Sequence, residues 1–484
     1  MSIQALRLRN VRGYRDVTLN LAPLTVLLGP NSSGKSSFSH PLAALAHCQR
    51  LYSGTRNATL TPENPEKADQ WPIDLGGYGD LATKGSKDKI HIDLLTSEGW
   101  VEFGFGLVPT APDLLWFSHV AYPRDVNVSA SSLGPTELSA VPGGPPSLVP
   151  SDNSTVDIGL GSNRSLRPVE DTNLVLERIN EQEWQHRGTD ASLGLDGLIP
   201  LNLRHSSGTE IILNRKSSNE IRSLLQDMAY LRANRKRPTR GYPRIRSEQK
   251  SIGYSGEKTA SVLLNRGLRE EKLICPPPTT STASENDLQA GWQERTTTLR
   301  DSVSQWLEHI GLAKNVQAAE SRRYGPEYVD VRVNVSAGGP SRDITEVGFG
   351  VSQALPVVVG ALLQPKDSLF VVDLPEAHLH PRPQAEIADL FCALAMSGRC
   401  ALVETHSEMF FHRLRLRAAM DSELMKAIAV YFVDAPNPDD TCNPPREVGL
   451  SFEQELAWPA GFLQEALDSE IQIRSVRQTR TRHD

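Results

Sequence analysis

One eight-residue segment restricts the possible folds of this chain more than any other feature: Gly29-Pro30-Asn31-Ser32-Ser33-Gly34-Lys35-Ser36. It satisfies the pattern G-x-x-x-x-G-K-[ST], follows the apolar run 24–28 and precedes a plausible helix, which is the context that this pattern requires. The glycines allow backbone N–H groups to converge on phosphate oxygens, and the start of the helix adds the positive end of its dipole. The segment therefore predicts a buried strand, a phosphate-binding loop and a helix, in that order.

The polar residues of this loop have expected roles in holding ATP and Mg²⁺. The Lys35 ammonium is expected to bridge the β- and γ-phosphates, and the Ser36 hydroxyl is a candidate Mg²⁺ ligand. The other expected nucleotide-binding residues of this segment are Gly29, Asn31, Ser33, Gly34 and Ser37.

The apolar run 368–373, toward the other end of the chain, ends in the carboxylate of Asp373. A carboxylate at the end of a buried strand is the usual Mg²⁺-binding partner of a phosphate loop. Asp373 is therefore the Walker B candidate and, with Ser36, the expected metal site. Because Lys35 and Asp373 meet only if both ends of the chain fold together, this pattern predicts an ATPase domain that is split by a large insertion.

Several boxes around Asp373 resemble those of bacterial AAA-annotated, ABC-like ATPases related to the OLD and SMC/Rad50 groups. The segment 373–381 (DLPEAHLHP) looks like their (D/E)-x-P-E-x-H-L-H-P box, and 404–408 (ETHSE) resembles their E-T-H-S box. The segment 347–353 (VGFGVSQ) is similar to their signature, and 458–462 (WPAGF) resembles a box that closes one uncharacterised branch. The resemblance spans both ends of the chain and part of the middle.

This resemblance implies roles for two groups of residues. The histidine of the E-T-H-S box is the switch residue that reaches the γ-phosphate, and the signature opens an apolar helix whose N–H groups contact a γ-phosphate held by a second subunit. A nucleotide sandwich dimer, or a higher homo-oligomer, is therefore implied. The implied catalytic residues are Asp373, Glu376, Glu404 and His406, and the implied signature contacts to nucleotide are Gly350, Ser352 and Gln353.

Leu374 departs from the ABC pattern, in which a catalytic glutamate directly follows the Walker B acid. A leucine side chain cannot polarise water. Either Glu376 or Glu404 substitutes, or hydrolysis is slow and ATP acts mainly to hold a dimer together. We expect slow turnover.

A basic stretch, Arg232 to Lys250, carries eight arginines and lysines against one acid, with three tyrosines nearby. Contact with nucleic acid is one interpretation. A solvated loop, a protein-binding surface and a part of the ATP site are the others. The wider segment 230–257 also resembles a recurring feature of the same family branch.

Composition sets the remaining expectations. No stretch approaches the roughly 18 apolar residues that a membrane helix needs, so we expect a cytoplasmic protein without membrane contact. A net charge of −7 argues against a protein that coats nucleic acid over its whole surface. The expected fold is α/β, a P-loop NTPase with an ABC-type domain whose parallel or mixed sheet is joined to an antiparallel N-terminal β subdomain. The expected parts are 1–118 and 326–446 (the two ATPase halves), 119–325 (the insertion) and 447–484 (a C-terminal extension with a basic tail).

The function expected from these features is that of an ATPase that assembles on ATP and regulates a partner effector encoded nearby. The resemblance implies this role because relatives are associated with anti-phage defence operons. A DNA-clamping ATPase of the SMC/Rad50 type is the first alternative, but no heptad run long enough for a coiled-coil arm is present. An OLD-like nuclease component is the second, but too little chain follows His406 for a nuclease domain of that type.

Overall fold

The structure is a computed structural model that describes residues 3–51, 75, 78–84, 86, 88–97, 99–108, 111–123, 173–178, 184–186, 189–196, 198–205, 210–212, 215–276 and 292–450. The chain divides into two compact units. Unit 1 comprises Leu21–Ala43 and Asp227–Asp484, and unit 2 comprises Ser2–Asn20 and Ala44–Gln226. The W-P-x-G-F box at 458–462 lies outside the described residues.

A six-stranded sheet organises unit 1. Five of its strands are parallel, and the last pairs antiparallel with its neighbour. The apolar runs at 24–28 and 368–373 form two of the strands, as predicted, and a further apolar run at 400–405 forms a third. All three are buried, as expected for a parallel sheet covered on both faces. The strand order is β12 (Ala229–Leu231), β19 (Leu369–Asp373), β20 (Cys400–Thr405), β3 (Leu24–Leu28), β21 (Ile428–Phe432) and β22 (Arg446–Glu447).

The register of this sheet brings the ends of distant segments to one edge. Thr405 lies opposite Leu28, and Asp373 lies opposite Glu404. Because the strands are parallel, the loops that follow β3, β19 and β20 all leave at this edge. The phosphate-loop segment and the segment after Asp373 are therefore neighbours, although they come from opposite ends of the sequence.

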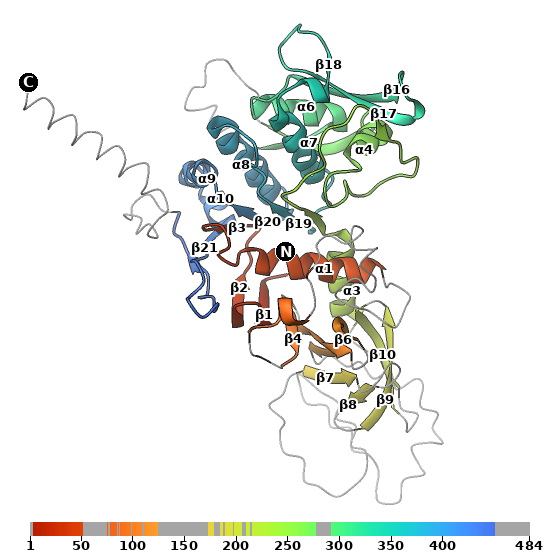
Figure 1. Cartoon of the computed structure of the whole chain (residues 1–484), viewed down its shortest axis with the longest axis vertical. Coiled ribbons are helices and arrows are strands. Elements are labelled where there is room, and N and C mark those ends of the chain that lie inside the picture. Colours follow the sequence, from red (N-terminus) through yellow and green to blue (C-terminus); the bar gives the residue numbers. More distant parts are fainter. Residues whose placement is uncertain are drawn as a thin grey trace, which may run out of the picture. The chain divides into compact units, whose positions relative to one another are not determined.

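Helices cover this sheet. The helix α7 is almost entirely apolar and buried, and Gly360 within it allows Ile252 and Phe370 to approach closely. Ser407 caps α9 by accepting a hydrogen bond from the Phe410 amide. Figure 1 shows α8 beside α9, and the two pack against each other. The helices are α1 (Ser36–Leu51), α7 (Phe349–Leu362), α8 (Pro381–Met396), α9 (Glu408–Met420) and α10 (Ser422–Ala427).

The rest of unit 1 surrounds a core centred on Trp306, which is fully buried. Val329, Val331 and Val333 alternate with polar residues along one strand, and all three are buried. The elements of this part are β13 (Tyr242–Pro243), α4 (Thr259–Arg266), β14 (Glu270–Cys275), β15 (Gln293–Thr298), α6 (Leu299–His309), β16 (Asn315–Ser321), β17 (Gly325–Asn334), β18 (Arg342–Asp343) and the 3₁₀ turn Ile344–Glu346.

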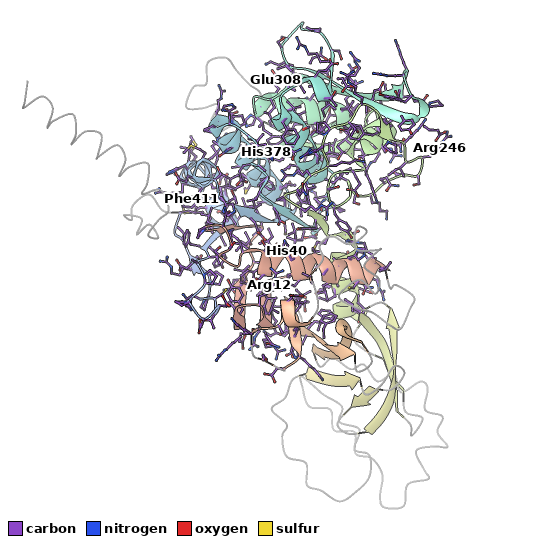
Figure 2. The ribbon with its side chains drawn as sticks, in the orientation of Figure 1. Arg12, His40, Arg246, Glu308, His378 and Phe411 are labelled. Atoms are coloured by element: carbon purple, nitrogen blue, oxygen red, sulfur yellow. The ribbon has the colours of Figure 1, made fainter. Side chains whose placement is uncertain are left out.

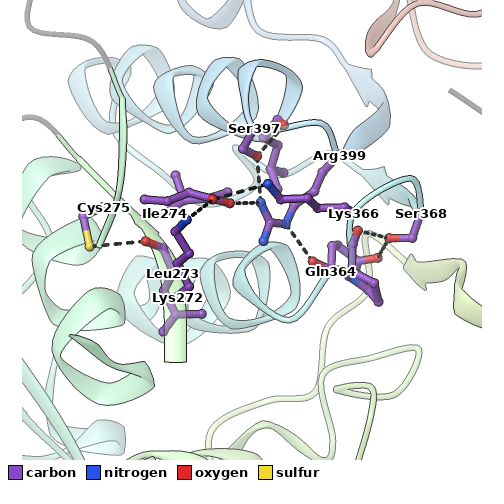
Figure 3. Close-up of polar contacts among 12 residues, drawn as sticks. Lys272, Leu273, Ile274, Cys275, Gln364, Lys366, Ser368, Ser397 and Arg399 are labelled. Carbon is purple, nitrogen blue, oxygen red and sulfur yellow. Dashed lines mark hydrogen bonds and ion pairs between the residues drawn. The ribbon is translucent and has the colours of Figure 1, made fainter. Parts of the chain in front are cut away.

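Two polar clusters hold the elements of unit 1 together. Buried Arg399, at the entry to β20, donates to the Gln364 carbonyl at 2.7 Å and to Glu294 of β15 at 2.9 Å (Figure 3). In the second cluster, Asp389 of α8 is fully buried. It accepts paired hydrogen bonds from Arg413 and Arg417 of α9, and it contacts His309 of α6 at 2.8 Å. Burial raises the pKa of Asp389, but the hydrogen bonds from the two arginines and the histidine outweigh burial and hold this pKa well below its ordinary range. Each cluster joins segments that are distant in sequence.

Unit 2 contains a ten-stranded antiparallel sheet. The first hairpin has Val11 opposite Tyr14, and the second has Thr96 opposite Gly99, which agrees with the antiparallel N-terminal β subdomain that was expected. The strand order is β11 (Glu210–Ile212), β10 (Ile199–His205), β9 (Thr189–Asp196), β8 (Trp184–His186), β7 (Asn173–Arg178), β6 (Ala111–Pro123), β5 (Gly99–Val108), β4 (Ile90–Thr96), β1 (Ala5–Val11) and β2 (Tyr14–Asn20); the described helices here are α2 (Tyr78–Leu81) and α3 (Arg215–Asp227).

The division at Asp227 falls inside the range 119–325 that was expected to be one insertion. The physical reason is β12, which pairs in parallel with β19 and so joins the same sheet as the strand that ends in Asp373. The four-part division stays a prediction. Among the described helices, none is both long and apolar enough to cross a bilayer.

Candidate nucleotide-binding site

The loop that follows β3 has the backbone geometry of a phosphate-binding loop. Gly29 has φ +150°, and a Cβ atom there would lie 2.3 Å from the Val433 carbonyl oxygen, so this position requires glycine. The Lys35 ammonium donates to the carbonyl oxygens of Gly29 at 3.0 Å and Pro30 at 2.6 Å. Burial lowers the pKa of Lys35 to about 8, although Glu404 and nearby acids oppose this shift. The amine therefore lies inside the loop, where phosphate oxygens would replace the carbonyls as acceptors. Ser33 and Ser37 are buried, and Asn31 is exposed.

Glu404, near the end of β20, accepts hydrogen bonds from the start of α1. Its Oε2 accepts from the Ser36 hydroxyl at 2.8 Å, and its Oε1 accepts from the Ser39 hydroxyl. Burial, followed by the negative charge of Asp373, raises the pKa of Glu404. The predicted Mg²⁺ ligand Ser36 is thus joined directly to one of the predicted catalytic acids.

Asp373 has one engaged oxygen and one without a partner. Its Oδ2 accepts from the Tyr230 hydroxyl at 2.5 Å and lies 3.6 Å from His40 Nε2, and Figure 2 labels His40 on α1. Its Oδ1 is buried and has no hydrogen-bond partner among the described residues. A buried carboxylate oxygen without a donor fits a role toward a hard cation. Ser36 and Asp373 are the residues that would hold Mg²⁺, which would neutralise phosphate charge.

Glu376 and His406 complete the polar edge. Glu376 Oε1 accepts from the Thr405 hydroxyl at 2.6 Å and from the His406 amide at 3.0 Å, whereas its Oε2 is buried without a partner among the described residues. Burial raises the pKa of Glu376. His406 Nδ1 lies 2.6 Å from the Gly29 carbonyl oxygen, and burial, followed by the charge of Lys35, lowers the pKa of its ring. The structure therefore brings the four predicted catalytic residues to the phosphate loop.

The signature segment packs against the loop that follows Asp373. The Phe349 ring meets His378 edge-on at 4.9 Å between centroids, and a Cβ at Gly350 would lie 3.2 Å from the His378 carbonyl oxygen. Phe349 is 40% exposed, but Ser352 is buried and its hydroxyl donates to the Phe349 carbonyl. Gln353 is also buried. The exposed part of this segment is therefore the start of α7 and not the two polar side chains.

The basic stretch contributes a buried arginine to the site, a role that the charge of the stretch alone did not indicate. Arg235 is buried, and its Nη2 donates to the carbonyl oxygens of Asp373 and Leu374, each at 2.8 Å. Burial lowers the pKa of Arg235 to about 10. Three other arginines of the stretch form ion pairs, and Figure 2 labels one of them, Arg246. These pairs are Arg240–Glu346, Arg244–Glu320 and Arg246–Glu327.

Tyr230, Arg235 and His40 are the residues of this site that sequence reasoning did not assign to it. The run 228–231 is short and apolar, which is typical of a strand, and this was the available signal for Tyr230. Arg235 and His40 carried no such signal, because their contacts at Asp373 come from distant parts of the sequence.

Unit 2 contains another group of metal-ligand side chains, His91, Asp93 and Glu102, whose ligand atoms lie within 4.8 Å of one another. The Arg9 guanidinium donates to Asp93 at 2.8 Å and Glu102 at 2.6 Å, and it lies 3.2 Å from His91 Nδ1. The Arg9 guanidinium therefore supplies the positive charge that these three side chains would otherwise take from a metal ion.

A parallel sheet with a G-x-x-x-x-G-K-S loop after one strand, an acid at the end of another and a strand between them defines a P-loop NTPase fold. The chain belongs to the family described as "AAA domain, putative AbiEii toxin, Type IV TA system", whose model matches residues 154–411, more than half of its length.

Three solved structures are similar to the chain at low levels. They are an SMC head bound to the C-winged helix domain of ScpA (10% identity, TM-score 0.38, 94% of this chain and 99% of that one), the SMC head domain from Thermotoga maritima (10%, 0.32, 89% and 94%) and a Pyrococcus furiosus Smc head with an extended coiled coil bound to the C-terminal domain of ScpA (9%, 0.37, 98% and 99%). Likeness of this degree carries no inference about activity or partners. No curated protein matches the chain.

Proposed function

We propose that this protein binds Mg·ATP, hydrolyses it slowly and forms a dimer or larger assembly when ATP is bound. The observation that carries the proposal is the convergence of Lys35, Ser36, Asp373, Glu404 and His406 at one sheet edge, from opposite ends of the chain. Positioning and electrostatic stabilisation are the main requirements of phosphoryl transfer, and these side chains supply both.

The expectation of slow hydrolysis rests on Leu374, which stands where the ABC pattern has a glutamate. Glu376 is the better substitute, because its Oε2 lacks a partner among the described residues, whereas both oxygens of Glu404 accept from serine hydroxyls. A carboxylate with one unengaged oxygen and a raised pKa suits a general base.

The proposed dimer contact uses the start of α7. Gly348 precedes this helix without a side-chain cap, and Phe349 is partly exposed beside His378. Backbone N–H groups at a helix start bind phosphate. Because Ser352 and Gln353 are buried, the backbone at Gly350 is the more accessible contact to a nucleotide held by a second copy.

The proposed biological role is that of a cytoplasmic sensor or regulator that acts on an effector protein in bacterial anti-phage defence. Support comes from the resemblance of the DLPEAHLHP and ETHSE boxes to those of relatives associated with such operons. The family's description, which mentions a putative toxin, is compatible with action on a partner protein.

A DNA-binding ATPase is the second candidate, and one surface observation favours it. The Arg323 guanidinium lies 5.3 Å from the Tyr324 ring centroid, and exposed Tyr328 lies beside Tyr324. Exposed aromatic rings with arginines suit single-stranded nucleic acid. Binding of labelled DNA that weakens with salt and is lost in Arg323→Ser/Tyr324→Ser would support this candidate; its absence would remove it.

The mass of the protein in solution tests the proposed function. Wild type is expected to gain mass on addition of Mg·ATP, and Lys35→Ala and Asp373→Ala are expected not to. Phe349→Arg is expected to bind ATP yet remain monomeric. Phosphate release well above about 10 s⁻¹, the median for enzymes, would contradict slow turnover. A mass that is independent of ATP would contradict the assembly.

A further inference from the structure

The two oxygens of the Asp373 carboxylate lie in different environments. Oδ2 accepts a hydrogen bond of 2.5 Å from the Tyr230 hydroxyl, and both side chains are almost fully buried. Oδ1 is buried without a partner among the described residues. Rotation of the carboxylate would break the bond to Tyr230, so the hydroxyl fixes which oxygen is presented to a bound cation.

The backbone of the same residue is held by Arg235. A single nitrogen, Nη2, donates to the carbonyl oxygens of both Asp373 and Leu374 at 2.8 Å. Leu374 has φ +46°, a left-handed conformation that is unfavourable for a residue with a Cβ atom. The Arg235 guanidinium thus stabilises the turn by which the chain leaves Asp373.

Tyr230 and Arg235 belong to one segment, and the fold fixes that segment on both sides. Tyr230 lies opposite Val371 in the parallel pair of β12 and β19. Beyond β12, the Arg232 amide donates to the Tyr254 carbonyl, and the Lys236 amide donates to the Ser255 carbonyl, each over less than 3 Å. The segment therefore has a defined position relative to Asp373 and is not a loose loop.

We propose that Tyr230 and Arg235 are positioning residues for the Mg²⁺-binding acid: Tyr230 orients the Asp373 carboxylate, and Arg235 fixes its backbone. This inference rests on the proposed function. Outer groups that orient a ligating carboxylate commonly change metal affinity 10- to 100-fold when they are removed. Tyr230 and Arg235 act through Asp373 and need not touch the nucleotide, so their loss affects the Mg²⁺ requirement more than nucleotide recognition.

Tyr230→Phe is the sharpest test, because it removes one oxygen and keeps the ring. Tyr242→Phe is a matched control, since Tyr242 is also a buried tyrosine, but its hydroxyl contacts the backbone amide of Thr239 instead of Asp373. The readout is binding of a fluorescent N-methylanthraniloyl ATP at increasing Mg²⁺ and, separately, in EDTA.

In Tyr230→Phe, the Mg²⁺ concentration at half-saturation is expected to rise about 10-fold or more. Nucleotide affinity in EDTA is expected to stay within about threefold of wild type, and Tyr242→Phe is expected to match wild type throughout. An unshifted Mg²⁺ dependence in Tyr230→Phe would overturn the inference, as would an equal shift in Tyr242→Phe. If wild type binds no nucleotide, the proposed function itself fails, and this is a distinct result.

Arg235→Lys provides an independent arm if Tyr230→Phe does not fold. Lysine keeps the charge, but its ammonium rotates freely on a flexible stem, whereas the planar guanidinium fixes the directions of the two N–H bonds of Nη2. Its expected result is the same direction of shift in Mg²⁺ half-saturation, with EDTA binding retained. If folded Arg235→Lys has the same Mg²⁺ dependence as wild type, the proposed role of Arg235 in fixing the Asp373 backbone is wrong.

Discussion

The imidazole Nδ1 of His406 lies 2.6 Å from the backbone carbonyl oxygen of Gly29, which is 377 residues earlier in the chain. Because a carbonyl oxygen only accepts hydrogen bonds, Nδ1 carries the hydrogen of this contact. One bond therefore fixes the histidine that directly follows β20 against the first glycine of the phosphate loop, and it sets the direction in which Nε2 points.

His406→Ala is expected to lower kcat for ATP hydrolysis roughly 100-fold, because the bond to Gly29 leaves Nε2 as the proton acceptor of the ring, and loss of one positioned proton-transfer group typically costs this much. ATP affinity is expected to change by less than about threefold, because the loop and Lys35 remain. Phosphate release and nucleotide titration measure the two quantities. His412→Ala, an exposed histidine on α9, is the control, and an equal loss there would contradict a specific role for His406.

Glu376→Gln is expected to lower kcat about 100-fold or more and to prolong the ATP-bound assembly, because an amide cannot accept the proton of water. The Thr405 and His406 hydrogen bonds can still form with the amide oxygen. Single-turnover hydrolysis and the lifetime of the assembly measure this effect. A larger loss in Glu404→Gln than in Glu376→Gln would reassign the base.

Glu404 makes stability depend on pH. Its pKa is raised above its ordinary value of 4.5 by burial and by Asp373. Between 4.5 and the raised value, the folded state binds more protons than the unfolded chain, so the free energy of unfolding falls as pH rises through this window. Glu404→Gln is expected to flatten the fall in urea midpoint between about pH 5 and 8. An unchanged slope, or the same flattening in exposed Glu423→Gln, would contradict this account.

Asp389→Ala is expected to reduce the free energy of unfolding by about 3–5 kcal/mol, because buried Arg417 and half-buried Arg413 would lose the carboxylate that they share. Urea denaturation followed by tryptophan fluorescence measures this loss, and Trp306, whose ring lies 5.6 Å from that of His309, is one of the residues that contribute to the signal. Arg382→Ala breaks an exposed ion pair on the same helix and is expected to cost less than about 1 kcal/mol. An equal loss of unfolding free energy in Asp389→Ala and Arg382→Ala would show that burial of the ion pair does not determine its contribution to stability.

The strands that carry the site were predictable because each is buried on both faces and so leaves an uninterrupted apolar run. This holds for 24–28, 368–373 and 400–405. Their order was not predictable from those runs, since all three have the same pattern. Only the structure places β20 between β3 and β19, and this position brings Glu404 to Ser36.

Arg235 shows why part of the site escaped prediction. A run of arginines and lysines usually indicates a solvated or anionic-partner surface, and nothing local distinguishes Arg235 from its neighbours. Its acceptors are carbonyl oxygens more than a hundred residues away, so its burial follows from the tertiary fold alone. Ser352 and Gln353 show the opposite case. Their place in the signature segment predicted contact with nucleotide, but the packing of α7 buries both side chains.

The place of β3 between β20 and β21 determines when this fold can form during synthesis. A ribosome adds about 5–20 residues per second, so the strand at 24–28 waits on the order of tens of seconds before either neighbour in its sheet exists. Such late, long-range pairing slows folding and leaves an apolar strand open to aggregation in the meantime. The strand that leads into the proposed phosphate loop is thus made long before its neighbours in the sheet, and products truncated before residue 400 lack both of the strands that pair with it among the described residues.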